Sequence, residues 1–226
     1  MSEQAEGVPA GADVQRERIL RAAARALAEY GFDRARLRDV SKAAGVSIGL
    51  IQHYFETRDG LFRDAFAWSV DELIGRWECV AVGEPEPWRR IELLVQELTT
   101  DPDLTRRCGT WLEFCASASR HLELRGGVQR VYDVWRQLMA GIISAGVEQG
   151  VFAPRLPAPT VVDLICALVD GCDMAIAAGI GEMTPDRYRG LLLDTASLAL
   201  GVAPAPGEPA RPATADHTAG TGGTGG

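Results

Sequence analysis

Histidine is scarce in this chain: 226 residues contain only His53, His121 and His217. No cluster of histidine, cysteine and carboxylate side chains has the spacing of a metal site. The chain also has no nucleophile elbow, no phosphate-binding loop and no cysteine–histidine pair at a spacing typical of catalysis. We therefore expect no metal, no cofactor and no enzymatic activity.

The cysteines are five, an odd number, and none forms a CxxC pair. Each lies in an apolar or helical context, at Cys79, Cys108, Cys115, Cys166 and Cys172. Buried, reduced thiols explain this distribution better than a redox or metal role, although that role stays open.

Long hydrophobic runs are also missing. The most apolar stretch, residues 160–180, is interrupted by Asp163, Asp170 and Asp173, whereas a membrane span needs roughly 18–20 apolar residues. The first thirteen residues lack the positive start and apolar core of a secretory signal. We expect a cytoplasmic protein with no membrane partner.

Acidic residues outnumber basic residues over the whole chain, which has a formal net charge of −8. This average hides a split, because residues 14–63 carry ten Arg or Lys against six acidic side chains. Phosphate contacts require basic side chains, so a basic N-terminal quarter on an acidic body is typical of a DNA-reading domain attached to a second domain that faces away from the duplex.

Hydrophobic periodicity predicts an all-α fold, because every amphipathic stretch has the helical period and no alternating strand pattern competes. The expected helices cover residues 13–31, 37–44, 47–53, a fourth from Thr57, and 88–98, 104–119, 122–149, 160–178 and 184–200. They divide into a three-helix helix-turn-helix domain and a larger C-terminal bundle for effector binding and dimerisation. The expected boundaries are a disordered segment at 1–12, the DNA-binding domain at 13–60, the effector and dimerisation domain at 61–202, and a disordered tail at 203–226.

The segment from Leu37 to Leu61 reads LRDVSKAAGVSIGLIQHYFETRDGL. With its AAGVS turn and HYF ending it resembles the reader of the TetR family, over about residues 14–66. Residues 111–179 more loosely resemble the sensor domain of the betaine-regulator branch, including the element Leu168-Val169-Asp170-Gly171. The resemblance implies a homodimer that binds a double-stranded DNA operator and a small-molecule effector.

The second helix of a helix-turn-helix enters the major groove. Helical spacing directs Val46, Ile51 and Phe55 inward, which leaves one set of side chains for the groove: Ser47, Ile48, Gly49, Leu50, Gln52 and His53. Gln52 can pair with adenine, and Ile48 or Leu50 can contact a thymine methyl. Core packing is an equal alternative for Leu50, and the resembling family often has polar or basic residues at both apolar positions.

Phosphate contacts require donors at the rim of the groove, and we assign them to Arg36, Arg38, His53, Tyr54 and Arg58. Arg58 is expected in the first turn of the fourth helix, where free backbone amides also favour an anion. Arg36 stands where the family usually has a threonine, so its assignment rests on charge. A solvated surface charge is the alternative for any single arginine.

The expected body has more large side chains than a small bundle needs, which favours a pocket between its helices. The candidate effector-binding residues are Trp77, Trp111, Phe114, Trp135, Met139, Asp170 and Met174. Core packing is the alternative for each aromatic, and a structural role for Asp170 and Asp173. A sharper hypothesis is that these carboxylates recognise a cation. Glu113 is a further polar candidate, with a solvated position as its alternative.

Residues 160–200 are apolar on more than one helical face, which favours burial against a partner. The leading hypothesis is therefore a dimeric repressor that an effector releases from a palindromic operator. One alternative is a helical enzyme or small-molecule carrier with a vestigial reader. Another is a structural DNA-binding protein without an effector, which would not require an acidic, aromatic-rich body.

Overall fold

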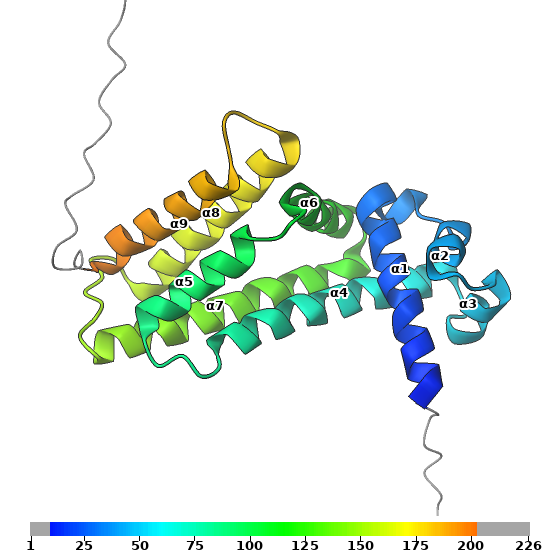
Figure 1. The fold of residues 1–226 in the computed structure, drawn as a ribbon, viewed down its shortest axis with the longest axis horizontal. Coiled ribbons are helices and arrows are strands. Elements are labelled where there is room, and N and C mark those ends of the chain that lie inside the picture. The colour runs from blue at the N-terminus through cyan, green and yellow to red at the C-terminus, as the bar shows by residue number, and fades with distance from the viewer. Residues whose placement is uncertain (1–9, 203–226) are drawn as a thin grey trace, which may run out of the picture.

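The computed structural model describes residues 10–202 of the chain. Within that range the fold consists of nine α-helices and one short 3-10 helix, without a strand, so the predicted all-α fold class is confirmed. The helices form two parts along the long axis of the molecule, a small one at α1–α3 and a larger one at α4–α9 (Figure 1). The tail predicted at 203–226 lies outside the described residues, as do residues 1–9. The first helix already begins at Ala10.

The small part, which we call the reader, contains α1 (Ala10–Arg34), α2 (Leu37–Ala44) and α3 (Ile48–Tyr54). Its helix ends are fixed by local chemistry. Gly45 follows α2 with φ of 63°, a left-handed conformation that costs glycine little. Ser47 caps α3, because its Oγ accepts a hydrogen bond from the Leu50 N–H at 3.1 Å. Both features agree with the predicted turn.

The first helix is bent near its end. Gly31 interrupts the helical backbone with φ of 73° and ψ of 166°, and a short turn then carries the chain through Arg34. The expected end at Gly31 therefore marks a kink, after which Phe32 and Ala35 are buried again. The turn from Gly31 to Ala35, which we call the hooked end of α1, lies directly before α2 and determines where the helix-turn-helix begins.

The large part, the body, contains α4 (Arg58–Ala81), α5 (Pro87–Thr99), α6 (Leu104–Arg120), α7 (Arg125–Glu148), α8 (Ala158–Ala178) and α9 (Pro185–Leu200), with the 3-10 turn η1 (Leu122–Leu124) before α7. The helix α4 begins beside the reader, capped by Thr57, and continues into the body, where it packs along α7 (Figure 1). The helix α6 contacts α1 at one end and α8 along its length. Two continuous helices therefore connect the reader with the body.

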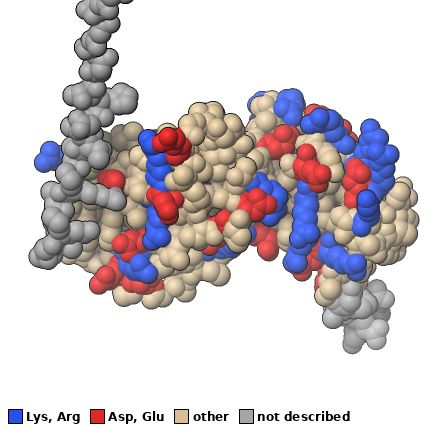
Figure 2. Space-filling view, turned by 45° about the horizontal axis from the view of Figure 1, so that its top comes forward, with Lys and Arg blue, Asp and Glu red and all other residues tan. Residues whose placement is uncertain are grey.

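Charge is distributed unevenly over this frame. Rows of Lys and Arg side chains lie over the reader, at the right of Figure 2, whereas the visible part of the body shows larger uncharged areas with mixed charges between them. This agrees with the charge split in the sequence. Among the described helices, none is both long and apolar enough to span a membrane.

Candidate functional site

The outer face of α3 is open to solvent. Ser47, Ile48, Gly49, Gln52 and His53 are exposed, and Ile48 retains 41% of its surface. The opposite face is buried through Ile51 and packs into the reader core. The helix is thus oriented as its spacing predicted, with Gln52 projecting away from the core. Leu50 is half-buried, so its position is compatible with both base contact and packing.

Two of the candidate phosphate-binding arginines are free of strong contacts. The Arg38 side chain is 69% exposed, and its Nε lies 3.6 Å from the carboxylate of its neighbour Asp39. Arg36 is also exposed, at the N-cap of α2. The ring of Tyr54 is half-buried and meets the exposed His53 ring at a centroid distance of 5.5 Å. Arg36 and Arg38 thus lie at the start of α2, and His53 and Tyr54 at the end of α3.

Arg58 differs from the other arginines, because its guanidinium group is engaged inside the reader. Its Nε donates to the Ala35 carbonyl at 3.0 Å, and its Nη2 donates to the Phe32 carbonyl. The group also lies over the ring of Phe62, 4.9 Å from the centroid, and pairs with Asp59. Arg58 therefore holds the hooked end of α1 against α4. Sequence reasoning missed this role because the two carbonyls become acceptors only through the kink at Gly31.

The body contains a cavity of about 280 Å³ between α4, α6, α7 and α8. Aromatic rings form much of its wall: Trp68, Trp77, Trp111, Phe114, Tyr132 and Trp135. Of the seven predicted effector residues, the structure brings five to this cavity, Trp77, Trp111, Phe114, Trp135 and Asp170. Trp68 and Arg107 also line it. Neither residue was predicted, because the residues beside them along α4 and α6 face either solvent or the core and do not indicate a side that faces a cavity.

Two predicted effector residues lie elsewhere. Met139 is 2% exposed and packs in the core beside a separate void, where α5 and α9 meet α7 and α8. Met174 is 52% exposed on the outer face of α8. Glu113 is also not part of the cavity wall, because its carboxylate accepts from Ser117 and lies against Gly31 of the reader. The structure therefore does not place these three residues at the aromatic cavity, since aromatic and sulfur content alone do not fix which helix face meets a cavity.

Asp170 is the polar group around which several aromatic side chains gather. Its carboxylate accepts a hydrogen bond from Trp111 Nε1 at 3.1 Å and one from the Tyr132 hydroxyl at 2.5 Å. Burial and this hydrogen bond raise the pKa of Tyr132 above its ordinary value, so the phenol stays protonated and keeps donating. Both donors are neutral. Within residues 10–202, no Lys or Arg forms an ion pair with Asp170.

A second carboxylate, Asp173, is 2% exposed and satisfied by several donors. Its Oδ1 accepts from Arg107 Nη2 at 2.9 Å, from the Tyr188 hydroxyl at 2.9 Å and from the Cys108 thiol at 3.1 Å. Burial would lower the pKa of Arg107, but Asp173 offsets this and the net pKa is raised. Burial also raises the pKa of Cys108 to about 12, which keeps the thiol protonated. The cluster ties α6 to α8 and α9.

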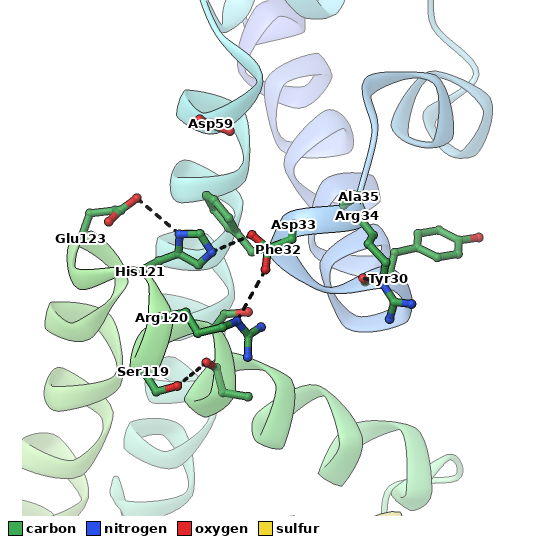
Figure 3. Close-up of polar contacts among 12 residues, drawn as sticks. Tyr30, Phe32, Asp33, Arg34, Ala35, Asp59, Ser119, Arg120, His121 and Glu123 are labelled. Atoms are coloured by element: carbon green, nitrogen blue, oxygen red, sulfur yellow. Dashed lines mark hydrogen bonds and ion pairs between the residues drawn. The ribbon is translucent and has the colours of Figure 1, made fainter.

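The helix α6 also reaches the reader. At its C-terminal end, His121 Nε2 lies 2.9 Å from one carboxylate oxygen of Asp33, and Arg120 Nε lies 3.5 Å from the other. The His121 ring packs against Phe32 at a centroid distance of 4.5 Å. Figure 3 shows these side chains meeting where the green α6 approaches the blue α1. Since Trp111 and Phe114 line the cavity, one helix connects the cavity wall with the hooked end of α1.

Comparison with known proteins agrees with this two-part arrangement. Residues 19–65 match the family model described as bacterial regulatory proteins, tetR family. Residues 87–201 match the model of the C-terminal part of BetI-type transcriptional repressors. The chain belongs to the TetR family. The resemblance seen in the reader sequence is confirmed, and so is the looser one in the body. As a TetR-family protein it is a transcriptional regulator.

Named relatives of this TetR-family chain are regulators as well. It is 31% identical over 186 residues to the HTH-type transcriptional regulator PksA of Bacillus subtilis (strain 168), covering 79% of this chain and 86% of that protein. It is 28% identical over 163 residues to the HTH-type transcriptional regulator BetI of Escherichia coli O127:H6, covering 70% of this chain and 80% of BetI. A solved structure, a putative transcriptional regulator from Saccharomonospora viridis in complex with choline, has a TM-score of 0.73 and 25% identity, covering 80% of this chain and 95% of that one.

The different surroundings of Arg58 and Arg38 predict different effects of removing each side chain. Arg58→Ala leaves two carbonyl oxygens without their donor, so we expect it to lower the free energy of unfolding by about 1–3 kcal/mol. Arg38→Ala should leave the thermal midpoint within about 1 °C and lower the salt dependence of DNA binding by about one unit for each phosphate that is no longer neutralised. Thermal denaturation and DNA titration at several salt concentrations measure both. An unchanged midpoint for Arg58→Ala would contradict its structural role.

Proposed function

We propose that this TetR-family regulator is a dimeric repressor, and that a small-molecule effector binding in the body releases it from a palindromic operator. The observation that carries the proposal is the single helix α6, which lines the aromatic cavity near its middle and contacts the hooked end of α1 at its C-terminus. An effector-free DNA-binding protein would not require such a cavity. An enzyme or carrier with a vestigial reader would not require an open, polar face on α3.

The exposed face of α3 supports sequence reading by Gln52, whose amide can pair with adenine through two hydrogen bonds. Exposure of Ile48 supports contact with a thymine methyl group. Arg36 and Arg38 are exposed at the start of α2, and we assign them to the phosphates, together with His53 and Tyr54 at the end of α3. Because Arg58 is engaged within the reader, we assign it no phosphate contact. Phosphate contacts would then set affinity, and α3 would set sequence choice.

Gln52→Ala tests the base-reading role. We expect it to cost roughly 1–3 kcal/mol of discrimination at one base pair in each half-site, while the salt dependence of binding stays nearly the same. Titration of operator and scrambled DNA at several salt concentrations measures both quantities, with Arg38→Ala as the control that changes the salt slope. If Gln52→Ala weakens operator and scrambled DNA equally, Gln52 does not read a base.

Dimerisation is supported by apolar side chains that the body leaves uncovered. Leu164 is 46% exposed and Met174 52% exposed on α8, and Leu198 is 83% exposed on α9. On α8, the small residues Ala167, Gly171 and Ala178 continue the stripe at spacings of three and four. Exposed apolar side chains arranged in this way are typical of an interface between helices. Two readers held by one dimer would fit an operator of two half-sites.

Leu164→Arg with Leu198→Arg tests the dimer, because both side chains are exposed in the single chain and their replacement should not disturb the core. We expect the double variant to sediment as a monomer at micromolar concentration and to lose tight operator binding. Far-UV circular dichroism should remain that of the wild type. A wild type that is itself monomeric under these conditions, or a double variant that stays dimeric, would contradict the proposed interface.

The cavity supports an effector that is a compact organic cation with apolar substituents. Asp170 brings a negative charge without a cationic partner in the described chain. Indole and phenol rings line the same cavity, and the face of such a ring can attract a cation. The related regulator from Saccharomonospora viridis was solved in complex with choline, which is consistent with this class. Entry of the cation would supply the charge that Asp170 lacks. The rearranged cavity wall would then shift α6 and, through Asp33, the reader.

Asp170→Asn separates charge from shape, because the amide keeps the size of the side chain. We expect it to weaken the binding of tetramethylammonium and larger alkylammonium ions by about tenfold or more, as measured by calorimetry or tryptophan fluorescence. Asp163→Asn is the matched control, since Asp163 lies on the same helix, is exposed and pairs with Arg136. Equal affinity of the cation for wild type and Asp170→Asn would rule out this recognition.

A further inference from the structure

The residues that line the body cavity differ in how far they are removed from solvent. The deepest, such as Trp77 and Trp135, are at most 6% exposed. Among the lining residues, those that are exposed are Glu72, Arg76 and Arg106. The first two belong to α4, and Arg106 belongs to the first turn of α6. The cavity therefore opens to solvent between α4 and the start of α6, and we call this opening the mouth.

The helices α4 and α6 meet at the end of the cavity that is nearer the reader. The rings of Phe66 and Phe114 pack against each other there, with their centroids 4.5 Å apart. Gly127 of α7 makes room for this pair, because a Cβ atom at this position would collide with the Phe66 ring. Beyond the ring pair, α4 follows α7 and α6 follows α8. The two helices thus pack on different neighbours, which leaves the mouth between them.

The polar side chains at the mouth do not tie its two sides together. Arg76 Nε pairs with Glu97 of α5 at 2.9 Å, and Arg106 Nε pairs with the N-cap residue of its own helix at 2.6 Å. The hydroxyl groups of Ser69 and Thr110 donate to carbonyls of their own helices, at 2.9 Å and 2.8 Å. Exposed ion pairs contribute little to stability, because water screens them. These side chains can therefore move aside without disturbing buried groups.

The side of the cavity where α6, α7 and α8 meet is closed by hydrogen bonds. Trp111, Tyr132 and Asp170 are half-buried there, one from each helix. The Asp170 carboxylate accepts from Trp111 Nε1 at 3.1 Å and from the Tyr132 hydroxyl at 2.5 Å. A molecule that passed on this side would have to break these bonds and leave partly buried polar groups without partners. Passage through the deep wall would displace the buried, closely packed rings of Trp77 and Trp135.

We infer that small molecules enter and leave the body cavity between α4 and α6, and that the side chains of Arg76 and Arg106 form a movable rim around this entrance. The inference concerns the route and not the ligand, so it goes beyond the proposed function and holds for any occupant of the cavity. The helix α1 packs against both α4 and α6. A molecule that enters by this route therefore passes between the two helices that support α1.

Two cysteines of α8 test the route without any effector. Cys166 belongs to the cavity wall and Cys172 does not, although both are buried and burial raises the pKa of both thiols. In the full-length protein, we expect the small, uncharged reagent methyl methanethiosulfonate to modify Cys166 at least about tenfold faster than Cys172, because only Cys166 is reached without unfolding. Mass spectrometry of the cysteine-containing peptides measures both rates in one sample.

Thr110→Trp narrows the mouth from the side of α6. It should slow the modification of Cys166 by about tenfold and leave the rate at Cys172 unchanged, because only access to the cavity is reduced. Thr105→Trp is the matched control, since Thr105 is exposed on the same helix but lies outside the cavity wall. This control should leave both rates near their wild-type values. If Thr110→Trp does not fold, Ser69→Trp narrows the mouth from α4 and gives the same test.

Equal rates for Cys166 and Cys172 in the wild type would overturn the inference, because modification would then follow general unfolding. A rate at Cys166 that Thr110→Trp leaves unchanged would overturn it as well, since the reagent would then enter elsewhere. Val131→Cys places a second reporter in the wall, on α7, and should show the same slowing. None of these measurements involves an operator or an effector, so their failure would leave the proposed function standing.

Discussion

The position of α6 depends on the buried carboxylate of Asp173. Through Arg107 and Cys108 it holds α6 against α8, and through Tyr188 it holds the start of α9 to the same point. Removing one partner of a buried ion pair costs roughly 3–5 kcal/mol, because the other charge is left uncompensated. This cluster therefore fixes one wall of the aromatic cavity. At its C-terminal end the same helix contacts Asp33 of the reader. The cluster therefore also helps to position the reader relative to the body.

Asp170 and Asp173 lie one turn apart on α8 but differ in burial and in hydrogen-bond partners. Asp173 has three donors, one of which is the cation Arg107, so its charge is balanced within the protein. Asp170 has only the neutral donors Trp111 and Tyr132. The two side chains are similar in the sequence, but within residues 10–202 only Asp173 of this pair forms an ion pair. The cavity wall thus combines a buried ion pair with an adjacent carboxylate that has neutral donors only.

Local chemistry made much of the fold predictable. Gly45, Ser47 and Thr57 mark helix ends because glycine tolerates positive φ and hydroxyl groups accept from free amides, and the structure places the helix ends at these residues. Helical periodicity also indicated the buried face of α3, including Ile51, and five residues of the cavity wall were named from the sequence. Met139 and Met174, which lie away from the cavity, occupy other faces of α7 and α8. That face is set by packing among four helices.

Contacts between distant segments were the least predictable. Arg58 meets the carbonyls of Phe32 and Ala35 only because α1 kinks at Gly31, and Glu113 faces that kink and not the cavity. No local pattern in the sequence predicts either of these two contacts. Within residues 10–202, Trp77 Nε1 and Arg107 Nε have no hydrogen-bond partner, and this too could not be predicted, because it depends on where every neighbouring residue lies.

The helix α4 begins beside the reader, is 24 residues long and reaches the cavity wall at Trp77 without interruption. A continuous α-helix transmits rotation as well as distance, since each residue advances the chain by about 1.5 Å and turns it by about 100°. An insertion or deletion of one residue in α4 would therefore re-aim α3 by more than a quarter of a circle relative to the body. The number of residues in α4 therefore determines the orientation of the reader relative to the body, and not only the distance between them.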